Sequence, residues 1–563
     1  MNNLPTQSTL GNRSLTWRNH PIYAHEPVAT WEALLASRAL HEEHPFFKPF
    51  LSELPDPFLM VDMQKAVDRI CQALDAGERI HIFGDFDADG VCGTTILFEA
   101  FRAIDAKISY SIPHRSEQGH GIGEDAVEEA LQAGCKVGIS VDTGITCFAA
   151  AELAMAKGLD IIITDHHLPD RTLPSAYAIL NPAREDCGFA DRQLCGTGVA
   201  FYLLVGIWKV RKQQGRPYHY DLRQLLDRVA IATVADVMSL VGINRILVHQ
   251  GLQRMNQNLA SIGVTALIKA VASRQKVIDA QTIGFFIAPH INAAGRMLHG
   301  EEALKLLSCQ DPAQTAPFIE VLLQANKTRR TIESEVFQAA EARLNGGDLL
   351  AAYDDQWHAG VVGLAAGRLA RKYHRPAAIG FLEPDGLIRL SLRSVSGYHI
   401  GEILHACSDC LVGFGGHQGA GGASLQPAHW QPFLTLFAQA IADQSGQQQL
   451  LPTLAIDGSL QLSAIHIELV KRLQRFEPFG RGNAPVVWLV QDVTLAQLDM
   501  KAGGVMRMRL SDGVQSLNAV MFGATKFKPS LSQGAMVSVI GSLQEDSYRG
   551  HGAIQFVVED FIV

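Results

Sequence analysis

Three carboxylates that alternate along one short stretch are the residues most able to do chemistry: Asp85, Asp87 and Asp89. They follow the apolar run 80–83, which predicts a buried strand, and precede a helical pattern. Acids in this place lie at the carboxyl end of a strand, where open α/β sheets bind ligands. Ionising three neighbouring carboxylates is costly without a cation. Hard oxygen ligands therefore indicate Mg²⁺ or Mn²⁺.

Three alternatives compete with this interpretation. The spacing D-x-D-x-D-G also opens an EF-hand calcium loop, but that loop needs a Glu at its twelfth position, where this chain has Ile96. The stretch could instead be an ordinary acidic turn. It could also carry the aspartyl nucleophile of a phosphatase. The choice depends on the motifs that follow.

Polar residues also follow two later apolar runs. Asp142 comes directly after 136–141, and Asp165, His166 and His167 come directly after 160–164. Taken singly, Asp142 could be a helix N-cap and the histidine pair a surface loop. Parallel strands of one sheet would bring all three ends to the same edge. Imidazole shifts the expected metal towards Mn²⁺, and several carboxylates suit two ions roughly 3.5–4 Å apart.

Strand-like runs that alternate with helical ones predict βαβ units and a parallel sheet. The fold class is therefore α/β and multidomain. A long helical pattern, a second and smaller α/β region, and a region of short strands typical of a small β-barrel such as an OB-fold follow. The expected organisation is an N-terminal arm (1–45), a catalytic domain (46–310), a connecting helix (311–347), a second α/β domain (348–445) and the barrel (446–563).

Further candidates lie along the chain. Asp236 ends another apolar run. Small residues between Asn292 and Arg296 allow a close backbone approach, and these two side chains could hold a phosphate. The alternative for that segment is a tight turn with a surface arginine. The glycine-rich stretch 413–422 with His417 fits a phosphate cradle or a plain turn. In the barrel, single strands could stack on and pair with Arg507, Arg509, Phe522, Tyr548 and Arg549, or the barrel could be structural.

Composition indicates a globular protein. Of 563 residues, 47% are hydrophobic and 19% charged, and the net charge is −9. Global charge thus does not indicate nucleic-acid binding, although basic footprints can be local. We expect no membrane span, because no apolar run approaches about 18 residues. A polar N-terminus and nine scattered cysteines favour a reduced, cytoplasmic protein.

Together these motifs resemble the DHH phosphoesterase family, and within it the RecJ-type exonucleases. Residues 85–90 are similar to motif I, 142–144 to motif II, and Asp165-His166-His167 to the eponymous DHH. The match continues in 234–236, in 292–296, in the DHHA1-type 415–417, and in 477–483, which resembles the lead into an OB-fold. The combination is highly specific, although no single motif is.

The resemblance implies a role for each residue. Two Mn²⁺ or Mg²⁺ ions would be held by Asp85, Asp87, Asp89, Asp142, His166 and Asp236. His167 would contact the scissile phosphate, and Asp165 would orient the histidine pair. The resemblance places Arg115, Ser391 and Arg393 at the 5′-terminal phosphate. It also places Arg296 and His417 along the phosphate path. His290 stands where the family has an arginine.

The resemblance also implies an activity, namely degradation of single-stranded DNA from 5′ to 3′ to mononucleotides in DNA repair and recombination. Asp87, Asp142, His166 and His167 would be the catalytic set. A monomer is expected, with single-strand-binding protein and a RecQ-type helicase as family partners. Two alternatives stay open: a DHH phosphodiesterase of short oligonucleotides or cyclic dinucleotides, which would not need a barrel, and a catalytically silent single-strand-binding scaffold.

Overall fold

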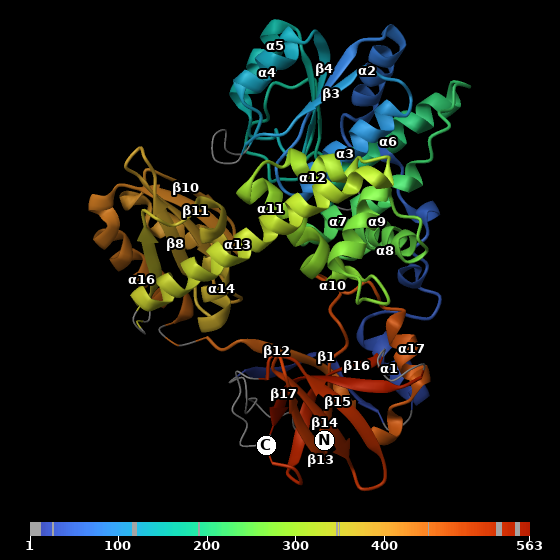
Figure 1. Cartoon of the computed structure of the whole chain (residues 1–563), viewed down its shortest axis with the longest axis vertical. Helices are drawn as coiled ribbons and strands as arrows, with labels where there is room; N and C mark the ends of the chain where they lie inside the picture. Colours follow the sequence, from blue (N-terminus) through green and yellow to red (C-terminus); the bar gives the residue numbers. More distant parts are fainter. Residues whose placement is uncertain are drawn as a thin grey trace. The chain divides into compact units, whose positions relative to one another are not determined.

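The chain divides into two compact units in its computed structural model (Figure 1). Unit I comprises Lys48–Arg330 and the short segment Pro478–Ala484, and unit II comprises the rest. Within the described part of the chain, no helix is both long and apolar enough to cross a membrane. The structure describes residues 13–24, 27–114, 121–189, 192–344, 347, 349–446, 448, 450–524, 532–546 and 552–562.

Unit I is built on a parallel sheet of order β3-β2-β4-β5-β6, which confirms the predicted sheet. Its strands are β2 (Arg79–Phe83), β3 (Ile108–Ser111), β4 (Cys135–Val141), β5 (Asp160–Thr164) and β6 (Ala178–Leu180). Successive side chains of a strand point to opposite faces. Ile162 accordingly joins one core, and Ile161 and Ile163 join the other. Apolar side chains fill both faces, so the sheet is covered by helices on both sides (Figure 1).

The two cores belong to different sets of helices. The first core includes side chains of α2 (Met63–Ala76), α3 (Ala88–Arg102) and α6 (Gly196–Gln213). The second includes those of α4 (Glu124–Gln132) and α5 (Phe148–Lys157). This arrangement leaves the carboxyl ends of the strands free to carry polar residues.

A set of helices packs against the other side of α3. Val91 of α3 lies in a core with these helices, whereas Ile96 and Leu97 lie in the core of the sheet. A buried ion pair, 2.9 Å long, joins Arg228 of α7 to Glu99 of α3. The helices are α7 (Leu226–Ala235), α8 (Gly242–Asn256), α9 (Ile262–Val271), α11 (Ala288–Met297) and α12 (Glu301–Leu307). The predicted long connecting helix is α13 (Thr315–Leu344).

Unit II contains a mixed sheet and a closed barrel. The mixed sheet has the order β10-β11-β9-β8-β7 and packs with α14 (Ala359–Tyr373), α15 (Ile400–Ala406) and α16 (Trp430–Ser445). Its strands are β7 (Leu350–Asp354), β8 (Ala377–Leu382), β9 (Ile388–Arg393), β10 (Gly413–Gly416) and β11 (Ala420–Leu425). The glycine-rich stretch is therefore largely a strand hairpin rather than an irregular loop.

Five strands close the barrel because β13 pairs with β14 on one side and with β16 on the other, as an OB-fold requires. They are β13 (Trp488–Lys501), β14 (Val505–Ser511), β15 (Ser516–Met521), β16 (Met536–Glu545) and β17 (Ile554–Ile562). Strand β12 (Thr453–Leu460) extends this sheet, and β1 (Ser14–Ala24), from the expected N-terminal arm, pairs in parallel with β12.

Candidate metal centre

The acid loop, residues 85–90, turns directly from β2 into α3. Asp87 is the N-cap of α3, and its side chain accepts hydrogen bonds from the backbone N–H groups of Asp89 (2.8 Å) and Gly90 (3.2 Å). A Cβ on Gly90 would lie 2.6 Å from backbone atoms of Asp85, so the loop closes too tightly for a larger residue. The cap fixes the loop and keeps all three carboxylates at the end of the strand.

Asp89 is anchored by the N-terminus of α6. Its two carboxylate oxygens accept hydrogen bonds from the backbone N–H groups of Gly196 (2.7 Å) and Thr197 (2.8 Å). The Thr197 hydroxyl donates to the carbonyl of Asp89. The positive end of a helix dipole stabilises a buried anion in this position. Asp89 is therefore held on a rigid support by backbone groups of α6.

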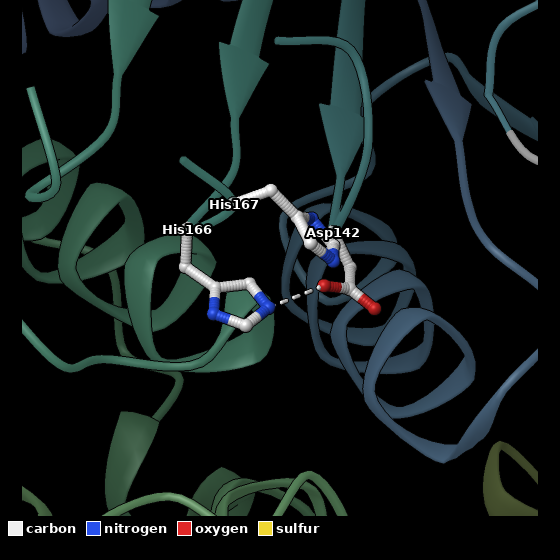
Figure 2. Close-up of side chains that lie close together, drawn as sticks. All are labelled: Asp142, His166 and His167. Atoms are coloured by element: carbon white, nitrogen blue, oxygen red, sulfur yellow. Dashed lines mark ion pairs between the residues drawn. The ribbon is translucent and has the colours of Figure 1, made fainter. Parts of the chain in front are cut away.

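Asp142 and His166 meet at the ends of β4 and β5. Asp142 has a left-handed backbone (φ 61°), a conformation that aspartate adopts more readily than most residues. Its Oδ1 lies 3.0 Å from Nε2 of His166 (Figure 2). The same imidazole nitrogen lies 3.6 Å from Oδ2 of Asp236 and 3.8 Å from Oδ2 of Asp89. Three carboxylates thus surround one nitrogen.

Asp165 orients the histidine pair through hydrogen bonds. Its buried carboxylate accepts hydrogen bonds from the backbone N–H groups of His166 and His167, and from Ile145. It also bonds Nδ1 of His167 at 2.7 Å. This hydrogen bond raises the pKa of His167 to about 9, so the imidazole is cationic at neutral pH. The His167 side chain is 57% exposed, and its Nδ1 is already engaged, so Nε2 can serve a ligand.

Asp236 follows the last residue of α7 and completes the cluster. Burial, together with the charges of Asp89 and Asp87, raises its pKa to about 8, while the charges of His167 and Arg481 oppose the shift. Burial and the charges of Asp85 and Asp89 likewise raise the pKa of Asp87 to about 6. Burial and its carboxylate neighbours hold the pKa of Asp142 well above its usual range. The cluster therefore carries more negative charge than its cationic neighbours compensate.

A divalent cation would compensate this excess of negative charge. Three overlapping groups each place one ligand atom per residue within 4.8 Å of the others: Asp142 with His166 and His167, Asp89 with His166 and Asp236, and Asp85 with Asp87 and Asp142. Asp142 Oδ1 and His166 Nε2 are buried and have no hydrogen-bond partner in the described part of the chain. Oxygen and imidazole donors that face one another in this way suit Mn²⁺ or Mg²⁺.

Four other residues of unit I were singled out in the sequence: Asn292, Arg296, His290 and Arg115. Asn292 and Arg296 lie on α11, and the side-chain oxygen of Asn292 accepts a hydrogen bond from the N–H of Ala88 (2.8 Å). His290 bonds the carbonyl of Phe286 and the side chain of Asn326, which fixes its ring. Arg115 lies outside the described residues.

In unit II, Ser391 and Arg393 lie together on β9, with Arg393 Nη1 3.1 Å from Ser391 Oγ. A Cβ on Gly363, in the N-terminal half of α14, would lie 2.7 Å from that hydroxyl. His417 lies in the β10–β11 hairpin, where its N–H donates to the carbonyl of Ala420. The three predicted residues thus lie on β9 and in the hairpin whose strand β11 pairs with β9. In the barrel, Arg507 and Arg509 lie on β14, and Tyr548 and Arg549 fall outside the described residues.

The sequence interpretation missed the residues that support the cluster. Gly196 and Thr197 act through backbone N–H groups, and their only trace in the sequence is a Gly-Thr-Gly at the start of an apolar helical pattern. Asn181 holds the histidine loop by donating to the carbonyl of His167 at 2.8 Å. Nothing around Asn181 in the sequence distinguishes it from a surface asparagine.

This parallel-sheet domain with its Asp-His cluster, followed by a mixed-sheet domain, defines a protein of the DHH class. Family models agree: "DHH family, N-terminal domain" matches residues 79–233, "DHHA1 domain" matches 346–443 and "RecJ OB domain" matches 456–560.

Relatives that match most of the chain show which family within the DHH class it belongs to. The single-stranded-DNA-specific exonuclease RecJ of Dickeya dadantii is 32% identical over 535 residues, covering 90% of this chain and 92% of the relative. The Escherichia coli protein of that name is 34% identical over 442 residues, covering 74% and 76%. The crystal structure of Thermus thermophilus RecJ in complex with Mn²⁺ matches with a TM-score of 0.77 at 26% identity, covering 98% of this chain and 80% of that one. The chain belongs to the RecJ family.

Proposed function

We propose that this protein is a single-stranded-DNA-specific exonuclease that degrades its substrate from the 5′ end to mononucleotides. The observation that carries the proposal is the convergence of seven acidic and histidine side chains at one sheet edge, in a chain that also has a closed OB-type barrel. Two ions, Mn²⁺ or Mg²⁺, would be held by Asp85, Asp87, Asp89, Asp142, His166 and Asp236. When bound, they supply Lewis acidity to the attacking water and the leaving oxygen.

The residues of this chain supply the rest of the chemistry. His167 carries a positive charge at neutral pH, and its Nε2–H, which Asp165 does not engage, donates to a non-bridging oxygen of the scissile phosphate. Asp165 keeps that ring in place and holds the backbone of His166. Charge stabilisation of this kind acts on the transition state because the donors are fixed before the substrate arrives.

The remaining roles are part of the same proposal. Arg115, Ser391 and Arg393 bind the 5′-terminal phosphate, Arg296 and His417 line the phosphate path, and Asn292 supports the acid loop. The barrel holds the single strand through basic and aromatic side chains such as Arg507 and Arg509.

The proposal also covers the location of the protein in the cell, its cellular role and its partners. All nine cysteines are free thiols, which supports a reduced, cytoplasmic location. A role in DNA repair and recombination follows from the proposed activity. Recruitment by single-strand-binding protein and a RecQ-type helicase, and a monomeric state, stay predictions.

Cleavage of end-labelled DNA tests the proposal. Single-stranded and duplex substrates carry a 5′ or a 3′ label and are incubated with Mn²⁺ or with EDTA. Metal-dependent release of mononucleotides from the 5′ end of single strands alone is the expected result. An Asp87→Asn variant purified in parallel controls for contaminating nucleases.

Two other outcomes would replace the proposal. Hydrolysis confined to dinucleotides or cyclic dinucleotides would make the protein an oligonucleotide phosphodiesterase. Tight binding of single strands without cleavage under any metal would make it a scaffold.

A further inference from the structure

A short turn from late in the chain belongs to unit I. Residues Pro478–Ala484 cluster with unit I, although the chain on either side of them belongs to unit II. Within the turn, Gly480 and Asn483 exchange two backbone hydrogen bonds of 2.9 and 3.1 Å. The buried side chain of Asn483 donates to the carbonyl of Pro478 at 2.9 Å. These hydrogen bonds fix the conformation of the turn.

The turn fits closely against the loop that follows α7. The N–H of Leu240 donates to the carbonyl of Arg481 at 2.7 Å. A Cβ on Gly480 would lie 2.6 Å from Cδ1 of Leu240, and one on Gly482 would lie 2.1 Å from Oγ of Ser239. Gly482 also has a left-handed backbone, with φ +75°. The left-handed backbone favours glycine at 482, and a Cβ at either position would displace a side chain of the loop.

The loop that the turn contacts is strained. Val237, directly after Asp236, has φ 55°, a conformation that is a true outlier for a β-branched residue. The residue is 61% exposed, so packing does little to compensate for the strain. Asn244 helps to hold the loop by donating to the carbonyl of Ser239 at 3.1 Å. A strained backbone persists only where its surroundings over-determine it, and it tends to mark functional sites.

We propose that the turn Pro478–Ala484 is a positioning element of the metal centre. By bonding Leu240 and packing on Ser239, it holds the loop 236–241 in the strained form that keeps Asp236 Oδ2 3.6 Å from His166 Nε2. Strand β13 of the barrel begins shortly after the turn. A short stretch of chain therefore connects the barrel to the turn that contacts the loop of Asp236. The inference rests on the proposed function only in taking Asp236 as a metal ligand.

A pair of glycine variants of the full-length chain tests the inference. Gly482→Ala drives a Cβ into Ser239, whereas Gly158→Ala strains an equivalent backbone (φ +76°) at the end of α5 with nothing within 4 Å of the new Cβ. Mn²⁺ affinity is measured by calorimetry and melting temperature by scanning calorimetry. We expect both variants to melt lower, and only Gly482→Ala to bind Mn²⁺ about 10- to 100-fold more weakly, the usual effect of losing ligand support.

Two further variants sharpen the test. Asn483→Ala removes the bond to Pro478 without adding atoms, so it should weaken Mn²⁺ binding in the same direction by a smaller factor, even if Gly482→Ala does not fold. Val237→Asn accepts the left-handed backbone more readily and should restore part of the affinity in the Gly482→Ala background.

The outcomes separate this inference from the proposed function. Wild-type Mn²⁺ affinity in both Gly482→Ala and Asn483→Ala would overturn the inference while leaving the exonuclease proposal untouched. A wild-type protein that binds Mn²⁺ but cleaves no DNA would overturn the proposed function. In that case a selective loss of Mn²⁺ affinity in Gly482→Ala would still support the positioning role.

Discussion

The side-chain oxygen of Asn292 accepts a 2.8 Å hydrogen bond from the backbone N–H of Ala88, which joins α11 to the first turn of α3. Nearby, a Cβ on Gly295 would lie 2.1 Å from the carbonyl oxygen of Phe86. The small residues expected to approach a phosphate therefore approach the acid loop itself. Asn292 supports the metal centre through the backbone that carries it.

Asn292→Ala should weaken metal binding. The variant leaves the N–H of Ala88 without its acceptor, which costs about 1–3 kcal/mol where the group is buried. We expect Mn²⁺ affinity to fall roughly tenfold, as for other outer-shell partners. Asn256→Ala is the matched control, because Asn256 accepts a similar 2.8 Å bond from the N–H of Ile278 away from the cluster. Equal Mn²⁺ affinities in the two variants would contradict the prediction.

Asp87→Asn should separate catalysis from folding. Asparagine caps a helix as well as aspartate does, so α3 keeps its N-cap while the cluster loses one charged ligand. We expect the cleavage rate to fall by more than about 100-fold, the upper range for losing a supporting partner, with single-strand binding largely intact. Asp279→Asn, at the N-cap of α10 (Ala280–Thr282), controls for the substitution itself. Loss of folding in Asp87→Asn would argue that Asp87 is structural. Asp87→Ala should abolish cleavage too and, in addition, cost about 1 kcal/mol of cap stability.

Removal of the metal should destabilise the protein more at pH 8 than at pH 6. The pKa values of Asp87 (about 6) and Asp236 (about 8) are raised above the ordinary value, so these groups bind protons in the folded state. Their contribution to the metal-free fold is full below about pH 4 and is lost as the pH rises through 6 and 8. The rise in melting temperature on adding Mn²⁺ should therefore be larger at pH 8 than at pH 6. A shift independent of pH would show that Mn²⁺ does not replace these protons.

His81 should make the fold sensitive to acid. Its two ring nitrogens lie 2.9 Å from the hydroxyls of Ser109 and Ser111, and burial lowers its pKa to about 4. Since the folded pKa is depressed, the stabilisation is present above about pH 6.5 and is lost as the pH falls towards 4. A shift of this size corresponds to about 3 kcal/mol.

Urea unfolding of the wild type and of His81→Gln at pH 7 and pH 4.5 measures this effect. Both proteins carry the same carboxylate cluster, so its opposite pH dependence cancels in the comparison. The wild type should lose more stability than the variant on acidification. Equal losses would mean that His81 is protonated without penalty in the folded state.

Much of the site was determined by the sequence alone. Apolar runs that end in Asp85, Asp142 and Asp165 were enough to predict the parallel sheet and the shared edge, because parallel strands must present their carboxyl ends together. The barrel followed from a region of short strands near the end of the sequence. In each case the information is local, since hydrophobic periodicity and strand ends are properties of neighbouring residues.

Only the tertiary structure decided how the site is supported. Thr197 holds Asp89, Asn292 holds Ala88, and Arg481 bonds Leu240, each across more than a hundred residues of sequence. Two of these partners act through backbone groups, which every residue possesses, so no residue type identifies them in advance. The strain at Val237 is equally invisible in the sequence, because valine is left-handed only where the surrounding contacts force it to be.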